Sequence, residues 1–118
     1  MPPKEEDTIH INIATYLALV LHKDDWTTIE VSNQQGGWAG KFKQIMLKKK
    51  GVKKGWPDIL IHHGEGKSIY LEVKSKDGAI QAEQKRLHKS LYDRRGIPTE
   101  IVRNVDEVKE VLKRHKII

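Results

Sequence analysis

The chain has 118 residues, of which 37% are hydrophobic and 32% are charged, and its formal net charge is +6. This length suits one domain, residues 1–118, with one modest core, and the longest aliphatic run, Leu17 to Leu21, is far too short to span a bilayer. The absence of cysteine excludes disulfides and thiolate sites and fits a reducing, cytoplasmic setting, and the N-terminus predicts neither a signal peptide nor a transit peptide.

The first element of the chain is predicted to be a helix over residues 6–22. Acidic residues at its start favour the positive end of a helix dipole. The alternation of Ile9, Ile11 and Ile13 would also fit a strand, but the length of the pattern argues for a helix. The apolar stripe at helical spacing consists of Ile9, Ile13, Tyr16, Leu17 and Val20.

The later elements are predicted from composition and from their boundary residues. In chain order we expect a strand at 26–31, a short helix at 38–50, strands at 58–62 and 68–74, a helix from about 81 to 95, a strand at 99–102 and a helix after residue 104. Gly51 and Gly96 are the expected helix stops, and Asn104 with Glu107 forms a capping-box pattern. The order αβαββαβα predicts an α/β fold with a helix-flanked mixed sheet that contains one hairpin.

The excess positive charge is concentrated in one stretch. Seven lysines and no acid lie between residues 41 and 54, whereas the rest of the chain carries 15 basic and 16 acidic residues. Such a basic band suggests a surface that faces a polyanion, with nucleic acid as the first candidate, and a solvated segment without a partner is the alternative. The band consists of Lys41, Lys43, Lys48, Lys49, Lys50, Lys53 and Lys54.

The predicted hairpin allows a geometric test. If a five-residue loop follows His62, then His62 lies opposite Ser68 and every facing pair has residue numbers that sum to 130. Asp58 then faces Glu72, and Lys74 projects from the same face as Glu72, about 7 Å further along the strand. The hairpin is therefore expected to bring two carboxylates and one ammonium together at its open end.

Two facing carboxylates are unfavourable unless a cation offsets their charges. Mg²⁺ prefers carboxylate and carbonyl oxygens together with several waters, and such an ion can activate a water and stabilise the charge that develops on a phosphodiester. Lys74 would orient or help deprotonate that water, or would stabilise the transition state. The alternative is a plain surface ion pair between Lys74 and Glu72.

Two motifs stand in fixed order along the chain. Gly55-Trp56-Pro57-Asp58 precedes Glu72-Val73-Lys74 by thirteen residues, and Gln84 lies on the helix that follows. Asn33, Gly36-Gly37 and the basic band lie upstream. This order resembles the PD-(D/E)XK nuclease superfamily and, within it, the virus-type replication-repair nuclease (VRR-NUC) family. The resemblance implies a restriction-endonuclease-like fold and a DNA endonuclease that depends on Mg²⁺ or Mn²⁺.

The resemblance also assigns roles to single residues. It implies that Asp58, Glu72 and the Val73 carbonyl bind the metal, that Lys74 is the catalytic lysine, and that Gln84 belongs to the active site. Independently, Gln84 is the polar residue on an otherwise apolar helical stripe, where it needs a polar partner. A role as an N-terminal helix cap is the alternative for Gln84.

The first predicted helix supplies a further acid. The resemblance implies that Glu6 binds the metal or a metal-bound water, with Glu5 as a rival, and stabilisation of the helix dipole is the alternative for both. The chain departs from the family pattern at two positions. His10 stands where glutamine is common, and Gln81 occupies a helix start that usually takes serine or threonine.

Three further kinds of residue have more than one interpretation. His62 and His63 are adjacent on a strand and point to opposite faces, so they are a poor metal pair and are interpreted as strand-end residues. Trp38 and Trp56 flank the basic band, where base stacking and core packing are both open. Asn33 is a candidate for contact with DNA, and turn chemistry is its alternative.

The acid pair, the lysine and the basic band together define the functional hypotheses. The leading hypothesis is a metal-dependent DNA endonuclease. The size of the chain resembles that of viral family members, which act as homodimers on branched DNA such as four-way (Holliday) junctions. A partner related by a two-fold axis would allow symmetric cutting of two strands. A non-catalytic DNA-binding module that uses the basic band is one alternative, and a nuclease directed at RNA is another.

Overall fold

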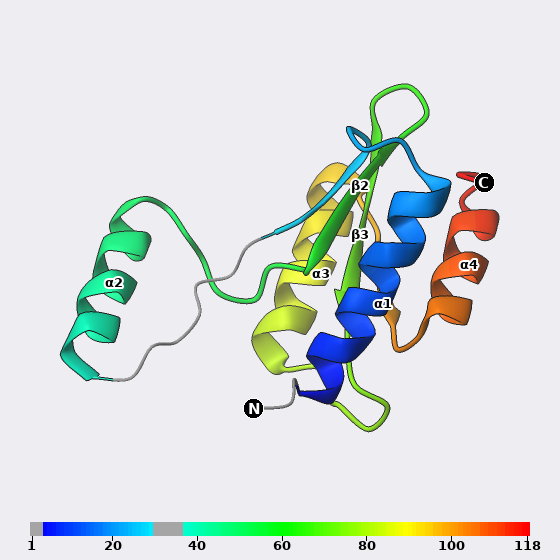
Figure 1. The fold of residues 1–118 in the computed structure, drawn as a ribbon. Coiled ribbons are helices and arrows are strands. Elements are labelled where there is room, and N and C mark those ends of the chain that lie inside the picture. The colour runs from blue at the N-terminus through cyan, green and yellow to red at the C-terminus, as the bar shows by residue number, and fades with distance from the viewer. Residues whose placement is uncertain (1–3, 30–36) are drawn as a thin grey trace.

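The computed structural model describes residues 4–29 and 37–118, and the elements follow the predicted order. Figure 1 labels most of them along the ribbon. The elements are α1 (Glu5–Val20), β1 (Trp26–Thr28), α2 (Gly37–Lys49), β2 (Ile59–His63), β3 (Lys67–Val73), α3 (Ala82–Arg95), β4 (Thr99–Val102) and α4 (Val105–Arg114).

The four strands form one mixed sheet in the order β1-β2-β3-β4. The first three strands are antiparallel neighbours, and β4 runs parallel to β3 after the α3 crossover. The pairs Ile59 with Leu71 and His62 with Ser68 confirm the predicted hairpin register. The hairpin extends one pair further than expected, to His63 and Lys67, so its loop is shorter than predicted.

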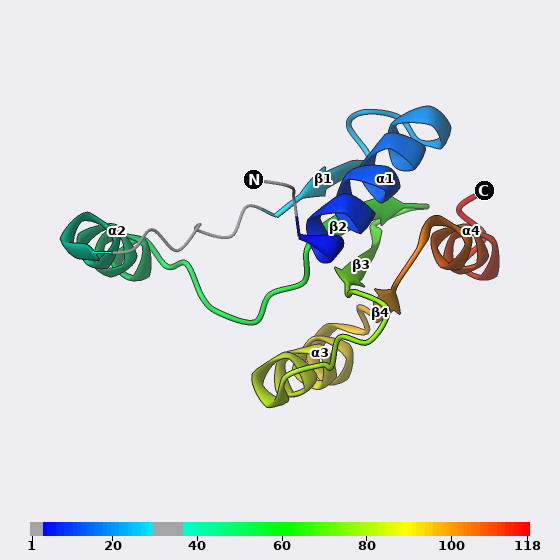
Figure 2. The ribbon, with the colours of Figure 1, turned by 60° about the horizontal axis from the view of Figure 1, so that its bottom comes forward.

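The core lies between one face of the sheet and the helices α1 and α4. Figure 2 shows these two helices on one side of the sheet and α3 on the other. Alternate residues of β2 and β3 are fully buried there, because a strand points every second side chain to the same face. The core cluster comprises Ile13, Leu17, Ile59, Ile61, Ile69, Leu71, Val73, Val102, Val108, Val111 and Leu112.

The first helix, α1, confirms the helical interpretation of its isoleucine pattern. Ile13 and Leu17 are fully buried, and Ile9 packs against the core. Val20, which the stripe placed on the same face, is 40% exposed because the helix ends there. The first strand is shorter than expected, since β1 ends at Thr28, and the rest of its predicted range includes residues outside the described part.

The last three elements begin and end as their boundary residues predict. Helix α3 ends at Gly96, whose φ of 68° is the left-handed conformation that glycine adopts without strain. Asn104 caps α4, because its side chain accepts a hydrogen bond from the Glu107 N–H at 2.8 Å. These caps fix the β3-α3-β4 crossover that covers the second face of the sheet.

Helix α2 stands apart from the sheet in both views (Figures 1 and 2). It forms where the sequence predicted a helix, but Phe42 and Ile45 on its apolar face are 55% and 54% exposed. Within the described residues, no helix is both long enough and apolar enough to cross a membrane.

Candidate active site

Asp58 and Glu72 lie opposite each other where the hairpin opens. Asp58 immediately precedes β2, and continuing the observed register places it across from Glu72 on β3. Glu72 is only 2% exposed, and Asp58 is half-buried. The Val73 N–H donates a hydrogen bond to Oδ2 of Asp58 at 2.8 Å, so the backbone of β3 fixes the Asp58 carboxylate.

The close approach of the two carboxylates has a clear electrostatic effect. Burial and the neighbouring Asp58 side chain raise the pKa of Glu72 to about 9, and the Glu6 charge adds to this effect while the Lys74 charge opposes it. Like charges brought together in a poorly solvated site favour a shared proton or a bound cation. The hairpin thus builds a site that is complementary to positive charge.

Lys74 follows directly after β3 and is 8% exposed. Its charge lowers the pKa of both Glu72 and His88, so the ammonium lies within electrostatic reach of both. The surface-pair interpretation fails because both residues are buried. No ion pair within 4.0 Å joins Lys74 to Glu72 in the described residues, so the ammonium is not held directly against this carboxylate.

Gln84, in the first turn of α3, combines the two roles that the sequence left open. Its Nε2 lies 3.4 Å from Oε1 of Glu72, within reach of a weak hydrogen bond to the acid pair. Its Oε1 accepts a hydrogen bond from the Gln81 N–H at 2.9 Å, which satisfies one of the free amides at the helix start. The two ends of one amide therefore connect the start of α3 to the site.

His88 is a site residue that the sequence reasoning missed. It lies one turn after Gln84, and its buried Nε2 is 3.6 Å from Oε1 of Glu72, without a hydrogen-bond partner in the described residues. Burial and the charge of Lys74 lower the pKa of His88, which favours the neutral imidazole. The signal was its i,i+4 spacing from Gln84, which places both side chains on one face of the helix.

The two acids at the start of α1 occupy different environments. Glu6 is half-buried, and its charge raises the pKa of Glu72. Glu5 is exposed, and its Oε1 accepts a hydrogen bond from the Lys76 N–H at 3.1 Å. His10 lies within hydrogen-bond distance of the Thr28 hydroxyl, at 3.0 Å. The geometry therefore associates Glu6, rather than Glu5, with the acid pair.

Arg103 is a second residue that the sequence reasoning missed. Its Nη1 donates to the carbonyl oxygens of Ser75 at 2.5 Å and Gly78 at 2.8 Å, in the turn that follows Lys74. This arginine comes from the connection between β4 and α4, about 28 residues further along the chain. No local feature of the sequence predicts such a contact, so only the tertiary structure reveals that Arg103 holds the turn after Lys74 through hydrogen bonds.

Comparisons with known proteins bear directly on this site. The model of the VRR-NUC domain family matches residues 4–106, most of the chain. This chain belongs to the VRR-NUC domain family. A solved structure described as a VRR_NUC domain protein is 17% identical and aligns over 97% of this chain and 89% of that chain, with a TM-score of 0.71. A search of curated protein sequences finds no match.

Membership in the VRR-NUC family makes this a nuclease-type domain, and the structural neighbour confirms the PD-(D/E)XK-like fold. The motifs that carried the resemblance converge in space as well. Asp58, Glu72 and Lys74 lie at one end of the hairpin, and Gln84 reaches them from α3. These contacts join residues that are up to 26 positions apart in the sequence.

The basic band of this VRR-NUC domain is exposed and extends from α2 to the start of α3. Five of its lysines lie on or directly after α2, away from the sheet (Figure 1). Lys53 and Lys54 line one cavity with Lys48 of α2 and another, shallow one with Trp56 and Glu83 at the start of α3. Asn33 and the side chain of Trp38 lie outside the described residues.

Trp56 and the paired histidines lie as packing residues would. The Trp56 ring is half-buried and makes an edge-to-face contact with Tyr70, with centroids 6.0 Å apart. This contact supports the packing interpretation of Trp56. His62 lies within hydrogen-bond distance of the Ser68 hydroxyl at 2.9 Å, whereas His63 stacks edge-on against His115, so the two histidines do not form a metal pair.

The acid pair also meets the chemical requirements of a hard divalent cation. Carboxylate oxygens are the ligands that Mg²⁺ and Mn²⁺ prefer, and the raised pKa of Glu72 reflects a charge that lacks full compensation. Among residues 4–29 and 37–118, no group of three or more acids and histidines is arranged to hold a metal. Two carboxylates with several retained waters are the usual set for Mg²⁺.

Proposed function

We propose that this VRR-NUC domain is a metal-dependent endonuclease that hydrolyses DNA phosphodiester bonds at Asp58 and Glu72. The proposal is carried by one observation. Two facing carboxylates are held together at the open end of the hairpin, where burial and mutual repulsion raise the pKa of Glu72. Two buried carboxylates that repel each other lower the stability of the fold unless a bound cation compensates their charges.

Each residue near the acid pair has a distinct task in this proposal. Asp58 and Glu72 hold a Mg²⁺ or Mn²⁺ ion, and the Val73 carbonyl is the proposed third protein ligand. The ion supplies charge neutralisation and an activated water. The Lys74 ammonium stabilises the negative charge that develops on the phosphate oxygens while the bond from water to phosphorus forms and the bond to the leaving sugar oxygen breaks.

The remaining site residues orient this core. Gln84 holds one oxygen of Glu72, which would leave the other oxygen to bind the cation. Glu6 is proposed to bind the cation or one of its waters, since its charge already acts on Glu72. The exposed lysines of the basic band are proposed to bind the phosphate backbone, and Lys53 and Lys54, which lie beside the start of α3, are proposed to bind it closest to the scissile bond.

The finer form of the proposal is a homodimer that cuts branched DNA such as four-way junctions. Each chain offers one acid pair, and two strands of opposite polarity are cut symmetrically only if a two-fold axis relates two sites. The exposed apolar face of α2 is the proposed contact with a second copy, because an isolated helix of 13 residues is marginal in water.

The deciding experiment is a cleavage assay on matched substrates. The chain is incubated with a four-way junction, a flap, a duplex, single-stranded DNA and an RNA hairpin, with Mn²⁺ or with EDTA. We expect cleavage of DNA only with the ion, with a preference for the junction. Cleavage of the RNA alone would assign the domain to RNA, and metal-dependent binding without product would favour a non-catalytic module.

Substitutions connect the assay to the site. Asp58→Ala and Lys74→Ala should each lower the single-turnover cleavage rate by at least about 100-fold, since each removes a charge used in the transition state. Lys76→Ala is the matched control, because Lys76 is exposed and its side chain lies two residues beyond Lys74. Circular dichroism and DNA affinity should be preserved in all three variants. Undiminished cleavage by both Asp58→Ala and Lys74→Ala would contradict the proposal.

A further inference from the structure

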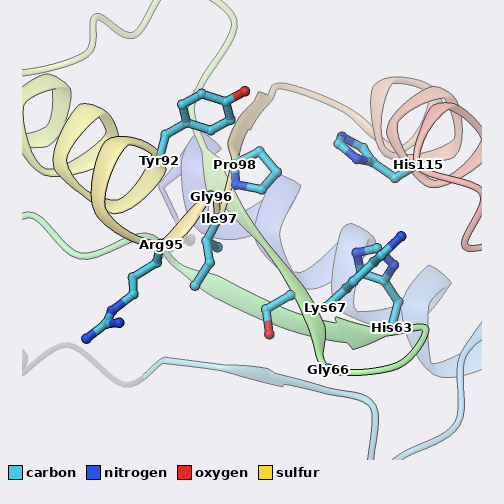
Figure 3. A pocket seen from close by; sticks show the side chains of 10 residues that line it. His63, Gly66, Lys67, Tyr92, Arg95, Gly96, Ile97, Pro98 and His115 are labelled. Carbon is cyan, nitrogen blue, oxygen red and sulfur yellow. The ribbon is translucent and has the colours of Figure 1, made fainter.

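A second cavity lies at the opposite end of the hairpin from the acid pair. It has a volume of about 420 Å³ and lies between the hairpin loop, the end of α3 and the end of α4. Figure 3 shows His63 and Lys67 of the hairpin near His115, with Tyr92 and Arg95 coming from the last turn of α3. Nothing in the nuclease site accounts for this cluster of basic and aromatic side chains.

The charges around this cavity are predominantly positive. Lys67 and Arg95 are exposed, and neither forms an ion pair in the part of the chain that the structure describes. Among these described residues, two acids adjoin the cavity. Glu100, beside His115, is already paired with Arg114 at 2.8 Å, and Asp25 lines the neighbouring hollow that shares His63 and Lys67. Burial, together with the charges of His115 and Lys67, lowers the pKa of His63, which is the effect of a positive environment.

The cavity also contains an unsatisfied polar atom. Nε2 of His115 is buried and has no hydrogen-bond partner among the described residues, and its distance of 3.7 Å from Oε1 of Glu100 is too long for a hydrogen bond. Buried polar atoms normally have a partner. A bound anion with acceptor oxygens would provide one for a protonated Nε2.

Two independent lengths relate the cavity to the acid pair. Along β3, the five residues from Lys67 to Glu72 span about 16 Å. Along α3, the eleven residues from Gln84 to Arg95 also span about 16 Å. This distance equals about five base-pair rises along the axis of a duplex, so a duplex that is bound at the acid pair can also bring its backbone to the cavity.

We propose that this cavity is a second phosphate-binding site, which holds a backbone phosphate of the duplex bound at the acid pair, about five base pairs further along its axis. Lys67 and Nε2 of His115 bind its oxygens, Arg95 on the opposite side of the cavity binds a neighbouring phosphate, and the exposed Tyr92 ring packs against the adjacent sugar or base (Figure 3). The inference rests on the proposed nuclease function and extends it, because it adds a contact that sets the path of the substrate.

The test compares two double variants that lose the same charge. Lys67→Ala with Arg95→Ala removes both cations of the cavity, and Lys113→Ala with Arg94→Ala removes two exposed cations that do not line it. Affinity for a 20-base-pair duplex is measured by fluorescence anisotropy in EDTA over a range of salt concentrations. Steady-state cleavage with Mn²⁺ then separates KM from kcat.

We expect the cavity variant to bind about tenfold more weakly and to lower the slope of log K against log salt by about 1.8, because two phosphate contacts are lost. KM should rise about tenfold while kcat at saturating DNA stays unchanged. The control should change affinity by less than twofold. Equal affinities and equal salt slopes of the two double variants would overturn the inference.

A crosslinking measurement locates the contact directly. The chain lacks cysteine, so Tyr92→Cys introduces a unique thiol at the cavity, and Lys85→Cys places one on the exposed face of α3 as a control. A duplex with one thiol-tethered phosphate, placed on either strand in turn, should crosslink to the cavity thiol most strongly when the tether is about five base pairs from the cleaved bond. A crosslinking pattern shared by both variants would overturn the inference.

The source of the phosphate is tested with the same duplex carrying either a 5′-phosphate or a 5′-hydroxyl. If the chain binds both duplexes with equal affinity, the cavity is assigned to backbone phosphates. If the cavity variant weakens binding of the 5′-phosphorylated duplex alone, the cavity is assigned to a terminal phosphate, which overturns the proposal of a backbone phosphate. A wild-type chain that cleaves no substrate contradicts the proposed function alone, since the anisotropy and its salt slope still report on the cavity.

Discussion

Glu72 occupies a position that few carboxylates tolerate. Its side chain is almost fully buried and faces Asp58, and within the described residues Lys74 makes no direct ion pair with it, while the lowered pKa of the nearby His88 favours a neutral imidazole. Burial of an uncompensated charge is among the most costly features of a folded protein. At the residue scale, function and stability are therefore opposed at this carboxylate.

This opposition predicts a pH-dependent stability in the absence of metal. The pKa of Glu72 is about 9 in the folded chain, against 4.5 as its ordinary value, so the folded state retains a proton that the unfolded state loses. The contribution of Glu72 to stability is then most favourable below about pH 4.5 and becomes steadily less favourable as the pH rises towards 9. Glu72→Gln should flatten this fall and should increase the free energy of unfolding at pH 8 by about 1 kcal/mol or more.

The measurement is urea unfolding in EDTA at pH 5 and pH 8, followed by thermal unfolding with and without Mn²⁺. Glu110→Gln is the matched control, because Glu110 is exposed on α4. Mn²⁺ should raise the melting temperature of the wild-type chain and of the control, but not that of Glu72→Gln. A Glu72→Gln chain that is less stable than the wild type at pH 8 would refute this account of the site.

At the scale of the element, α3 is both a scaffold and a part of the site. Its first turn places Gln84 against Glu72, and the next turn places His88 there. The same Gln84 side chain caps the helix through the Gln81 N–H. Its last turn supplies Tyr92 and Arg95 to the second cavity. One helix of 14 residues thus reaches both ends of the hairpin.

The two roles of Gln84 can be separated by comparison with a residue that only caps. Gln84→Ala and Asn104→Ala each remove one capping acceptor, at α3 and at α4, and each should lower the free energy of unfolding by about 0.5–2 kcal/mol. Only Gln84→Ala should also reduce the cleavage rate, by about tenfold or more, because only Gln84 contacts Glu72. Urea unfolding measures the change in stability, and single-turnover cleavage measures the change in rate. If both variants cleave DNA at the same rate, Gln84 has only the capping role.

At the scale of the whole molecule, the chain consists of a packed body and a separate basic helix. The body contains the sheet and three helices, whereas α2 stands apart from it (Figures 1 and 2). Ile45 and Met46 on α2 are 54% and 37% exposed. A helix with such exposed apolar side chains gains little from burial in one chain, so a second copy of the chain is the proposed partner.

This proposal predicts that an acidic substitution on α2 disrupts the dimer. Ile45→Asp should shift the chain from dimer to monomer in sedimentation velocity, because it places a charge in the apolar contact. Ile11→Asp is the matched control, because Ile11 is 58% exposed on α1 and its substitution changes the net charge by the same amount. A wild-type chain that sediments only as a monomer at working concentration would contradict the dimer.

The sequence alone determined the elements and the pairing that builds the acid site. Periodicity, turn residues and caps predicted all eight helices and strands in order, because these signals act over a few neighbouring residues. The hairpin register followed from one short loop, and it brought Asp58 opposite Glu72. The family motifs then identified Lys74 and Gln84 as their companions.

The tertiary structure decided how far each side chain is buried and which distant residues complete the site. The choice of Glu6 over Glu5, the contact of His88 with Glu72 and the clamp by Arg103 each depend on how separate elements pack together. The separation of α2 from the sheet was equally invisible in the sequence, since a run of lysines has the same composition whether its helix lies on the body or apart from it. Local signals fix elements, whereas electrostatic effects at a site depend on distance and solvent exposure, which only the packed chain defines.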